Sequence, residues 1–219
     1  MGREIDLLRS LPKSDRKISE RKNFKNPKMI EIARHFGEEY FDGAREYGYG
    51  GYRYDGRWQS VARDLIEEYG LRSGMRILDV GCAKGFLLKD IQDQIADVKV
   101  TGIDISKYAI MNCHPDVAGS VYVGNAHKLY FPDKSFDLVI SINTLHNLEK
   151  ADVVVALGEI ERISRGASYI VVDSYKTSHQ KRVFEDWVLT AKFHDYPEGW
   201  LRVFRESGYT GDYSWTIIQ

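Results

Sequence analysis

The chain has 219 residues, which suffices for one α/β domain with an extension but hardly for two independent domains. Its 31 lysine and arginine residues nearly balance 32 aspartate and glutamate residues, so the net charge of -1 predicts no general attraction to nucleic acid. The two cysteines lack disulfide or zinc spacing and fit a reducing cytoplasm. Neither an apolar run of about 18 residues nor an apolar leader is visible, so we expect no membrane span and no export.

The first part of the chain is polar. Residues 1 to about 28 are locally basic and are interrupted by Pro12 and Pro27, which predicts a loosely attached tail. Apolar residues at helical spacing then precede Gly37, and they predict a short amphipathic helix.

A tyrosine- and glycine-rich segment occupies residues 47–57. Its glycines disfavour helix and strand, while its tyrosines disfavour a solvated linker. We expect this segment to close over a ligand as a lid, and packing of its rings on the sheet edge is the alternative. Residues 1–57 are therefore assigned to a tail, a short helix and a lid, and residues 58–219 to the main domain.

The main domain alternates helices and strands. A helix pattern starting at Trp58 ends at Gly70. Strands are predicted at 75–80, 98–103, 121–124, 136–142 and 169–172, with helices between them, and two more helices lead to a last strand at 212–218. This order predicts a three-layer, doubly wound, mostly parallel sheet that binds its ligand at the carboxyl ends of the strands.

The turn after the first strand carries the strongest chemical signal. Asp79 lies two residues before Gly81, which permits a tight turn, and Gly85 lets the next helix approach closely. A carboxylate at this place would repel a pyrophosphate but suits a positively charged ligand such as S-adenosylmethionine. Ala83 stands where G-x-G-x-x-G has its second glycine, which weakens the dinucleotide alternative.

Polar residues also follow the next three strands. Asp104 lies about 20 residues beyond the turn, where an acid can bind ribose hydroxyls. Asn125 and Ala126 follow the third strand, and Asn143 to His146 follow the fourth. Because the carboxyl ends of parallel strands share one edge of the sheet, these positions predict a single ligand site.

The turn resembles motif I of the class I S-adenosylmethionine-dependent methyltransferases, acid-x-G-x-G-x-G, with Ala83 at the middle glycine, and the resemblance extends from about residue 58 to 175. It implies a Rossmann-like fold with S-adenosylmethionine as cofactor and S-adenosylhomocysteine as product. The implied cofactor contacts are Asp79, Gly81, Cys82 and Gly85 at the methionine end, Asp104 at the ribose, Ile105, Asn125 and Ala126 around the adenine, Asn143 at the methionine portion, and Tyr52 and Arg57 from the lid. The family usually ends its sheet with an antiparallel hairpin, whereas only one strand is predicted here after the fifth.

Other motifs narrow the reaction. The segment Ser141 to Thr144 lacks the N-P-P-Y pattern of amino methylation in DNA, and no paired-glutamate loop of protein arginine methyltransferases is found. The carboxylate of the metal-dependent catechol type is missing as well, so no metal is implied. The remaining class methylates an O or N atom of a small polar acceptor. The chain further resembles bacterial methyltransferases that modify small polar or sugar-like precursors of surface polysaccharides.

Two residues are candidate bases for a hydroxyl acceptor. His146 titrates near neutral pH, although a structural role in its loop is the alternative, and Asp173 ends the fifth strand. The residues expected to contact the acceptor are Tyr49, Tyr54, Trp187 and Lys192, with Trp200 as a further candidate. The alternative functions are a non-catalytic cofactor-binding protein and a nicotinamide-dependent oxidoreductase or epimerase. No sequence feature specifies an oligomeric state.

Overall fold

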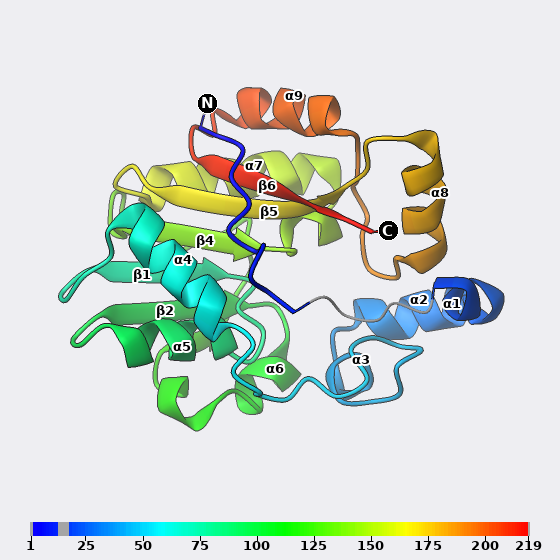
Figure 1. Ribbon diagram of the computed structural model, residues 1–219, viewed down its shortest axis with the longest axis horizontal. Helices are drawn as coiled ribbons and strands as arrows, with labels where there is room; N and C mark the ends of the chain where they lie inside the picture. The colour runs from blue at the N-terminus through cyan, green and yellow to red at the C-terminus, as the bar shows by residue number, and fades with distance from the viewer. Residues whose placement is uncertain (1, 13–17, 219) are drawn as a thin grey trace.

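The computed structural model describes residues 2–12 and 18–218. A six-stranded sheet with the order β3-β2-β1-β4-β5-β6 forms its centre, and every neighbouring pair of strands is parallel (Figure 1). The strands are β1 (Arg76–Val80), β2 (Lys99–Asp104), β3 (Val121–Val123), β4 (Leu138–Ile142), β5 (Ser168–Ser174) and β6 (Asp212–Ile217). The predicted doubly wound α/β sheet is therefore confirmed. Its strand order reverses between β1 and β4, which is where such sheets bind ligands.

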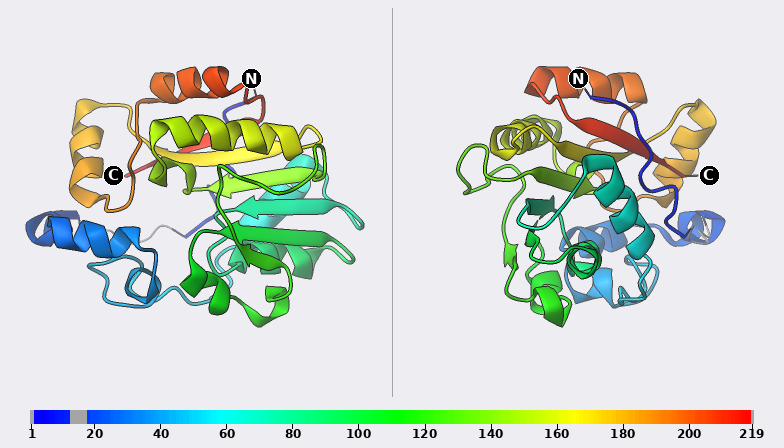
Figure 2. Two further views of the ribbon diagram at one scale, coloured as in Figure 1. Left: turned by 180° about the vertical axis from the view of Figure 1, so that it is seen from behind. Right: turned by 60° about the vertical axis from the view of Figure 1, so that its left-hand side comes forward.

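Helices cover both faces of the sheet and the carboxyl ends of its strands. The helices are α1 (Ile18–Phe24), α2 (Pro27–Arg34), α3 (Glu38–Phe41), α4 (Gln59–Tyr69), α5 (Phe86–Gln94), α6 (Lys107–Met111), α7 (Lys150–Ile163), α8 (Ser178–Trp187) and α9 (Pro197–Ser207), with 3-10 turns η1 (Pro115–Val117) and η2 (Leu145–Asn147). Figures 1 and 2 show α4 and α5 on one face, α7 and α9 on the other, and α1, α2, α3 and α8 near the carboxyl ends of the strands. Within the described ranges, no helix has both the length and the apolar composition to cross a membrane.

Side-chain alternation along the strands builds two cores. In β1, Ile77 packs in a cluster with Leu65 of α4 and Ile91 of α5, whereas its neighbour Leu78 packs in a second cluster with Leu157 of α7. Successive strand residues point to opposite faces, so a strand covered by helices on both sides must be apolar at nearly every position. That requirement explains the continuous apolar runs of the central strands.

The predicted helix boundary signals have their expected geometry. The hydroxyl of Ser106 accepts from the backbone N–H of Ala109 and caps α6. Gly70 ends α4 and Gly208 ends α9, each in the left-handed conformation that glycine adopts without strain. These caps fix where α6 begins and where α4 and α9 end.

The start of the chain differs from the predicted loose tail. Glu4 forms a parallel bridge with Tyr213 of β6, the N–H of Ile5 donates to the Tyr213 carbonyl at 2.9 Å, and Leu7 is only 2% exposed within the core cluster of α4. Apolar residues hidden in the polar tail cause this docking. Residues 13–17, which the tail prediction also included, lie outside the described residues.

The last strand completes the sheet in an unexpected orientation. β6 runs parallel to β5 from Tyr169↔Asp212 to Ser174↔Ile217, so the family's usual antiparallel hairpin has no counterpart among the described residues. The bridge between Glu4 and Tyr213 covers part of the free edge of β6. A covered edge protects the sheet from pairing with another chain.

Candidate active site

A cavity of about 560 Å³ lies at the carboxyl ends of β1, β2, β3 and β4. The predicted site residues that line it are Gly81, Asp104, Ile105, Asn125, Ala126 and Asn143, together with Tyr49 and Lys192 from the predicted acceptor set. The chain therefore brings the strand-end residues together around one space, as the sequence predicts. We call this space the strand-end cavity.

The turn after β1 is held tightly against the end of β2. The N–H of Ala83 donates to Asp104 Oδ2 at 2.7 Å, and the N–H of Ser106 donates to Asp104 Oδ1 at 2.8 Å. Gly81 has a φ of +89°, and a Cβ added there would lie 1.9 Å from Thr144 Oγ1. Only glycine fits this position. Asp104 thus fixes the turn while its remaining lone pairs are available to the cavity.

Asp79 is buried at the floor of the turn. The residue is 5% exposed. Its carboxylate makes no hydrogen bond or ion pair with any described residue. Burial, with a contribution from the nearby charge of Asp104, raises the pKa of Asp79 to about 7. A buried carboxylate without a cationic partner is costly, and a positively charged ligand group would relieve that cost.

One side of the strand-end cavity is apolar. Ile105 is 55% exposed although it borders the cavity, and Ala126 and Leu148 lie on the same lining. Asn125 Oδ1 accepts from the N–H of His127 at 3.2 Å, which orients the carboxamide. An exposed isoleucine beside an oriented carboxamide suits a flat ring that has polar edges.

Residues from the N-terminal helices close the other side of this cavity, and the sequence reasoning missed them. Phe36, Tyr40 and Phe41 line it, and Ser106 Oγ donates to the Phe36 carbonyl at 2.5 Å. The aromatic residues on either side of Gly37 could have indicated this contact. The sequence analysis uses Gly37 only as the end of a helix.

Several predicted site residues do not line the strand-end cavity: Asp79, Cys82 and Gly85 from the predicted cofactor set, and Tyr54 from the predicted acceptor set. The Cys82 side chain packs in the core cluster that contains α4 and α5, and burial raises the pKa of its thiol. Gly85 precedes α5 at a φ of +74°, and a Cβ there would lie 2.7 Å from Val117, so its space serves helix packing. Tyr54 lines neither cavity of the site, because its hydroxyl bonds to Asp90 Oδ1 at 2.5 Å.

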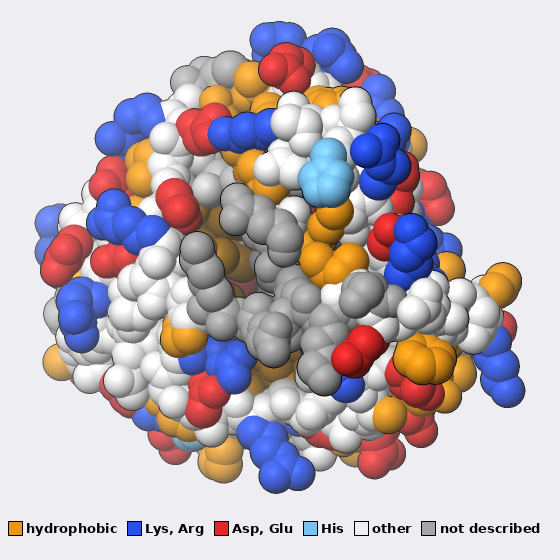
Figure 3. Space-filling model, turned by 45° about the vertical axis from the view of Figure 1, so that its right-hand side comes forward, with side chains coloured by type: hydrophobic (Ala, Val, Ile, Leu, Met, Phe, Trp, Pro, Cys, Tyr) orange, Lys and Arg blue, Asp and Glu red, His pale blue; other side chains and the backbone are white. Residues whose placement is uncertain are grey.

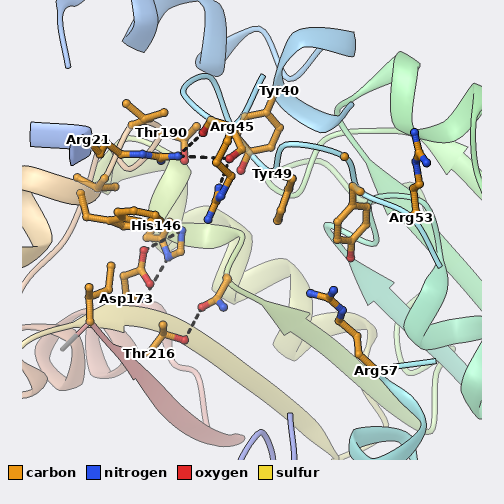
Figure 4. A pocket seen from close by; sticks show the side chains of 18 residues that line it. Arg21, Tyr40, Arg45, Tyr49, Arg53, Arg57, His146, Asp173, Thr190 and Thr216 are labelled. Atoms are coloured by element: carbon orange, nitrogen blue, oxygen red, sulfur yellow. Dashed lines mark hydrogen bonds and ion pairs between the residues drawn. The ribbon is translucent and has the colours of Figure 1, made fainter. Parts of the chain in front are cut away.

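A second cavity of about 360 Å³ adjoins the first (Figure 4). Tyr40, Tyr49, Asn143 and Thr190 line both cavities. The predicted site residues found only in the second one are Tyr52, Arg57, His146, Asp173 and Trp187. Tyr52 and Arg57, predicted as cofactor contacts, line the second cavity, whereas Lys192, predicted as an acceptor contact, lines the strand-end cavity. Trp200 is fully buried in the core, where its Nε1 donates to the Asp173 carbonyl at 3.0 Å.

Asn143 lies at the junction of the two cavities with a φ of +53°. Its Oδ1 accepts from Thr216 Oγ1 of β6 at 2.8 Å, and its N–H donates to the Val171 carbonyl at 2.8 Å. A non-glycine residue in the left-handed region costs energy and persists where its surroundings hold it. Hydrogen bonds from Asn143 to β5 and β6 therefore fix the point where the two cavities meet.

His146 and Asp173 form a pair in the second cavity. His146 Nδ1 accepts from the backbone N–H of Asp173 at 3.1 Å, and His146 Nε2 lies 3.4 Å from Asp173 Oδ2. Because Nδ1 accepts, the ring proton of the neutral imidazole is on Nε2 and faces the carboxylate. Burial lowers the pKa of His146 in spite of the opposing effect of Asp173. Both residues line the cavity, but in this arrangement neither histidine nitrogen is free to take a proton, whereas the Asp173 carboxylate can accept one.

The tyrosine- and glycine-rich segment is packed onto the turn. Tyr52 stacks on Phe86 with ring centroids 4.9 Å apart, and its N–H donates to Asp42 Oδ1 at 3.0 Å. Asp42 in turn accepts from the buried Lys84 at 2.6 Å. The segment is therefore attached to the turn after β1 through Phe86 and, by way of Asp42, through Lys84.

A parallel sheet with this strand order and a cavity at its switch point has the Rossmann-like, doubly wound architecture. Residues 78–172, less than half of the chain, match the family described as "Methyltransferase domain". The fold prediction is confirmed.

Similar proteins agree with this class. The chain is 34% identical over 130 residues to "Demethylmenaquinone methyltransferase" of Symbiobacterium thermophilum, covering 55% of this chain and 51% of the relative. It is 33% identical over 101 residues to "Fatty-acid O-methyltransferase" of Mycolicibacterium smegmatis, covering 45% and 36%. The matches therefore span about half or less of these relatives. A solved complex of the Haloferax volcanii Trm112 methyltransferase activator with a methyltransferase shares the fold, with a TM-score of 0.57, 21% identity, and coverage of 84% of this chain and 77% of that one.

Proposed function

We propose that this protein transfers a methyl group from S-adenosylmethionine to an O or N atom of a small polar acceptor. The observation that carries the proposal is the junction at Asn143, where a cavity with cofactor-type residues meets a cavity that contains the Asp173 and His146 pair. Methyl transfer requires an acceptor atom aligned with the methyl group, and two adjoining cavities allow that alignment.

The residues of the strand-end cavity fit the cofactor. Asp104 offers acceptor lone pairs to ribose hydroxyls, and Ile105 with Asn125 suits the adenine. Asp79 does not line the cavity itself, and its buried carboxylate beneath the turn would favour the cationic end of the cofactor through its charge. When bound, S-adenosylmethionine supplies an electrophilic methyl group. Gly81 and Asn143 also line this cavity, and their backbone would contact the methionine portion of the cofactor. Cys82, Gly85, Tyr52 and Arg57 would act on the cofactor only indirectly in this proposal, since the strand-end cavity does not include them.

For a hydroxyl acceptor we assign the proton to Asp173. S-adenosylmethionine would supply the methyl group and would be left as a thioether, and the Asp173 carboxylate would take the proton of the acceptor hydroxyl. His146 acts as a positioning residue, because its Nε2 faces Asp173 Oδ2 at 3.4 Å. A neutral amine acceptor would need only the alignment.

The acceptor class follows from the second cavity. Its lining is mostly polar or charged and includes Tyr49, Thr190 and Thr216. This composition favours a small polar acceptor, including the sugar-like class that the sequence resemblance suggests. The names of the relatives instead include a quinone precursor and a fatty acid, and those acceptors belong to those proteins.

The cofactor assignment is tested by calorimetry with S-adenosylhomocysteine. We expect Asp104→Ala to weaken binding by about 1 to 3 kcal/mol, because ribose hydrogen bonds to a charged group are lost. The matched control is Asp116→Ala, which removes an exposed aspartate outside both cavities. Equal affinities of the folded Asp104→Ala variant and the wild type would refute the ribose role. Binding of a nicotinamide dinucleotide in preference to S-adenosylhomocysteine would favour the oxidoreductase alternative.

A further inference from the structure

One carboxylate joins three elements that surround the strand-end cavity. Asp42 follows α3, and its Oδ2 accepts from Lys84 Nζ at 2.6 Å and from the Tyr108 hydroxyl at 2.8 Å. Its Oδ1 accepts from the N–H of Tyr52 at 3.0 Å. Lys84 belongs to the turn after β1, Tyr108 to α6, and Tyr52 to the tyrosine- and glycine-rich segment. Asp42 therefore ties the end of α3 to the turn, to α6 and to that segment.

The pair of Lys84 and Asp42 differs from an ordinary surface ion pair. The Lys84 side chain is 7% exposed and that of Asp42 is 27% exposed. Burial would raise the pKa of Asp42, but the hydrogen bonds from Lys84, Tyr108 and Tyr52 outweigh burial and lower this pKa, so the carboxylate is charged at neutral pH. Acidic and basic side chains are intermixed on the coloured part of the face in Figure 3, and exposed pairs of that kind contribute little. A buried ammonium group, in contrast, is costly once its partner is removed.

The helix α3 is held at both of its ends. Ser106 Oγ donates to the Phe36 carbonyl before α3 at 2.5 Å, and Asp42 makes its bonds directly after α3. The helix also packs against α6. Holding α3 in place therefore holds one side of the strand-end cavity closed. We call the side chains that line the cavity on this side the aromatic wall, and they are Phe36, Tyr40 and Phe41.

A purely structural role for the pair is the competing explanation, because a buried ammonium group needs an acid wherever it lies. The tyrosine- and glycine-rich segment has separate attachments to α5, since Tyr52 stacks on Phe86 and Tyr54 bonds to Asp90. Those contacts leave the position of α3 to its own ties. Neither Lys84 nor Asp42 is among the residues that line the two cavities, so the pair acts on a ligand only through the aromatic wall.

We propose that Lys84 and Asp42 form a latch that holds the aromatic wall against the strand ends, and that opening of this latch sets the rate at which the cofactor enters and leaves. The inference rests on the proposed function for the identity of the ligand and adds its route of exchange. Because neither latch residue lines the cavity, the pair stabilises the closed form equally with and without a ligand. Loss of the latch therefore speeds entry and exit by similar factors and leaves the affinity nearly unchanged.

Hydrogen exchange of the protein without added ligand tests the latch itself. We expect the backbone amides of residues 36–43 to exchange about fivefold faster or more in Asp42→Asn and in Lys84→Met, because the closed form loses a charge-assisted hydrogen bond. The amides of β4 are the internal reference, and their exchange should not change. Asp93→Asn is the matched control, since it removes the acid of the Lys89–Asp93 ion pair on α5 and should leave residues 36–43 as in the wild type.

Surface plasmon resonance with S-adenosylhomocysteine tests the exchange of the cofactor. We expect the association and dissociation rate constants of Asp42→Asn both to rise by about fivefold or more, with Kd within about twofold of the wild type. The double variant Asp42→Asn/Lys84→Met should be no faster than Asp42→Asn, because the two residues act as one unit. Tyr108→Phe removes one donor to Asp42 and should raise both rate constants by about twofold. This milder variant decides the matter if Asp42→Asn fails to fold.

Each outcome bears on the latch separately from the proposed function. A faster dissociation with an unchanged association rate would overturn the latch, because it would mean that a contact to the ligand was lost. Unchanged exchange of residues 36–43 in Asp42→Asn would also overturn it, as would equal acceleration in Asp93→Asn or in β4. Failure of S-adenosylhomocysteine to bind to the wild type would refute the proposed function, while hydrogen exchange would still decide whether the latch closes the aromatic wall.

Discussion

At the scale of single residues, the buried carboxylate of Asp79 lowers the stability of the ligand-free protein but favours the binding of a cationic ligand. The ordinary pKa of an aspartate is about 4 in the unfolded chain, whereas burial raises the pKa of Asp79 to about 7 in the folded protein. The folded state therefore holds this proton more tightly than the unfolded state. The contribution of Asp79 to stability is greatest below about pH 4, falls as the pH rises toward 7, and levels off above it.

We expect Asp79→Asn to stabilise the ligand-free protein at pH 8 by about 2 to 4 kcal/mol, because the cost of a buried charge is removed. The gain should shrink toward zero at pH 4. The same variant should bind S-adenosylhomocysteine at least tenfold more weakly, because the cationic end of the ligand loses its partner. Urea unfolding at the two pH values, with calorimetry, measures both effects, and Asp116→Asn is the control. A variant that binds the ligand as tightly as the wild type would contradict the role given to Asp79.

The pair of Asp173 and His146 predicts unequal effects of mutation. For a hydroxyl acceptor, Asp173→Asn should lower kcat by about 100-fold or more, because the proton acceptor is lost. His146→Asn should lower kcat by about tenfold, because the carboxylate loses only its orienting partner. Cofactor affinity should stay within about twofold of the wild type in both. Single-turnover rates decide the matter, and a larger loss in the histidine variant would return the base role to His146.

At the scale of elements, the segment 47–57 is held by aromatic packing and by the bond from Tyr54 to Asp90. If it acts as a lid, S-adenosylhomocysteine should slow tryptic cleavage after Arg53 by about fivefold or more, because the ligand stabilises the closed form. Cleavage after Arg72, an exposed residue in the turn before β1, is the control and should not change. Equal rates at Arg53 with and without ligand would leave the segment with a packing role only.

The N-terminal arm makes a second prediction about elements. Leu7 is 2% exposed, and its N–H donates to the Tyr169 hydroxyl at 3.1 Å, whereas Leu8 is only partly buried. Leu7→Ala should therefore lower the free energy of unfolding by about 2 to 4 kcal/mol, through lost burial and a cavity. Leu8→Ala should cost clearly less. Denaturant unfolding measures both, and a Leu7→Ala variant as stable as the wild type would show that the arm adds nothing to the core.

At the scale of the whole molecule, the sequence predicted what depends on local pattern. The alternation of strands and helices, the turn at Gly81 and the cap at Ser106 are local signals, and the structure has each of them. The docking of Leu7 and the pairing of Asn143 with Thr216 depend on contacts between distant parts of the chain, which periodicity does not report. The directions of Tyr52 and Arg57 likewise depend on distant or specific contacts, the packing on Phe86 and the pairing with Asp55, so the sequence could not say which cavity they line.

The division of labour between the two cavities also has a consequence for how such proteins diversify. The matched region, residues 78–172, contains the turn, Asp104 and Asn125, whereas Arg21, Arg45 and Trp187 lie outside it. In the proposed function, the part of the chain that matches the family is thus the part that faces the cofactor. Helices and loops added before and after it form most of the acceptor side. Exchanging those flanking segments between relatives should therefore transplant substrate preference while leaving cofactor use intact, which makes this arrangement a natural starting point for engineering new acceptors.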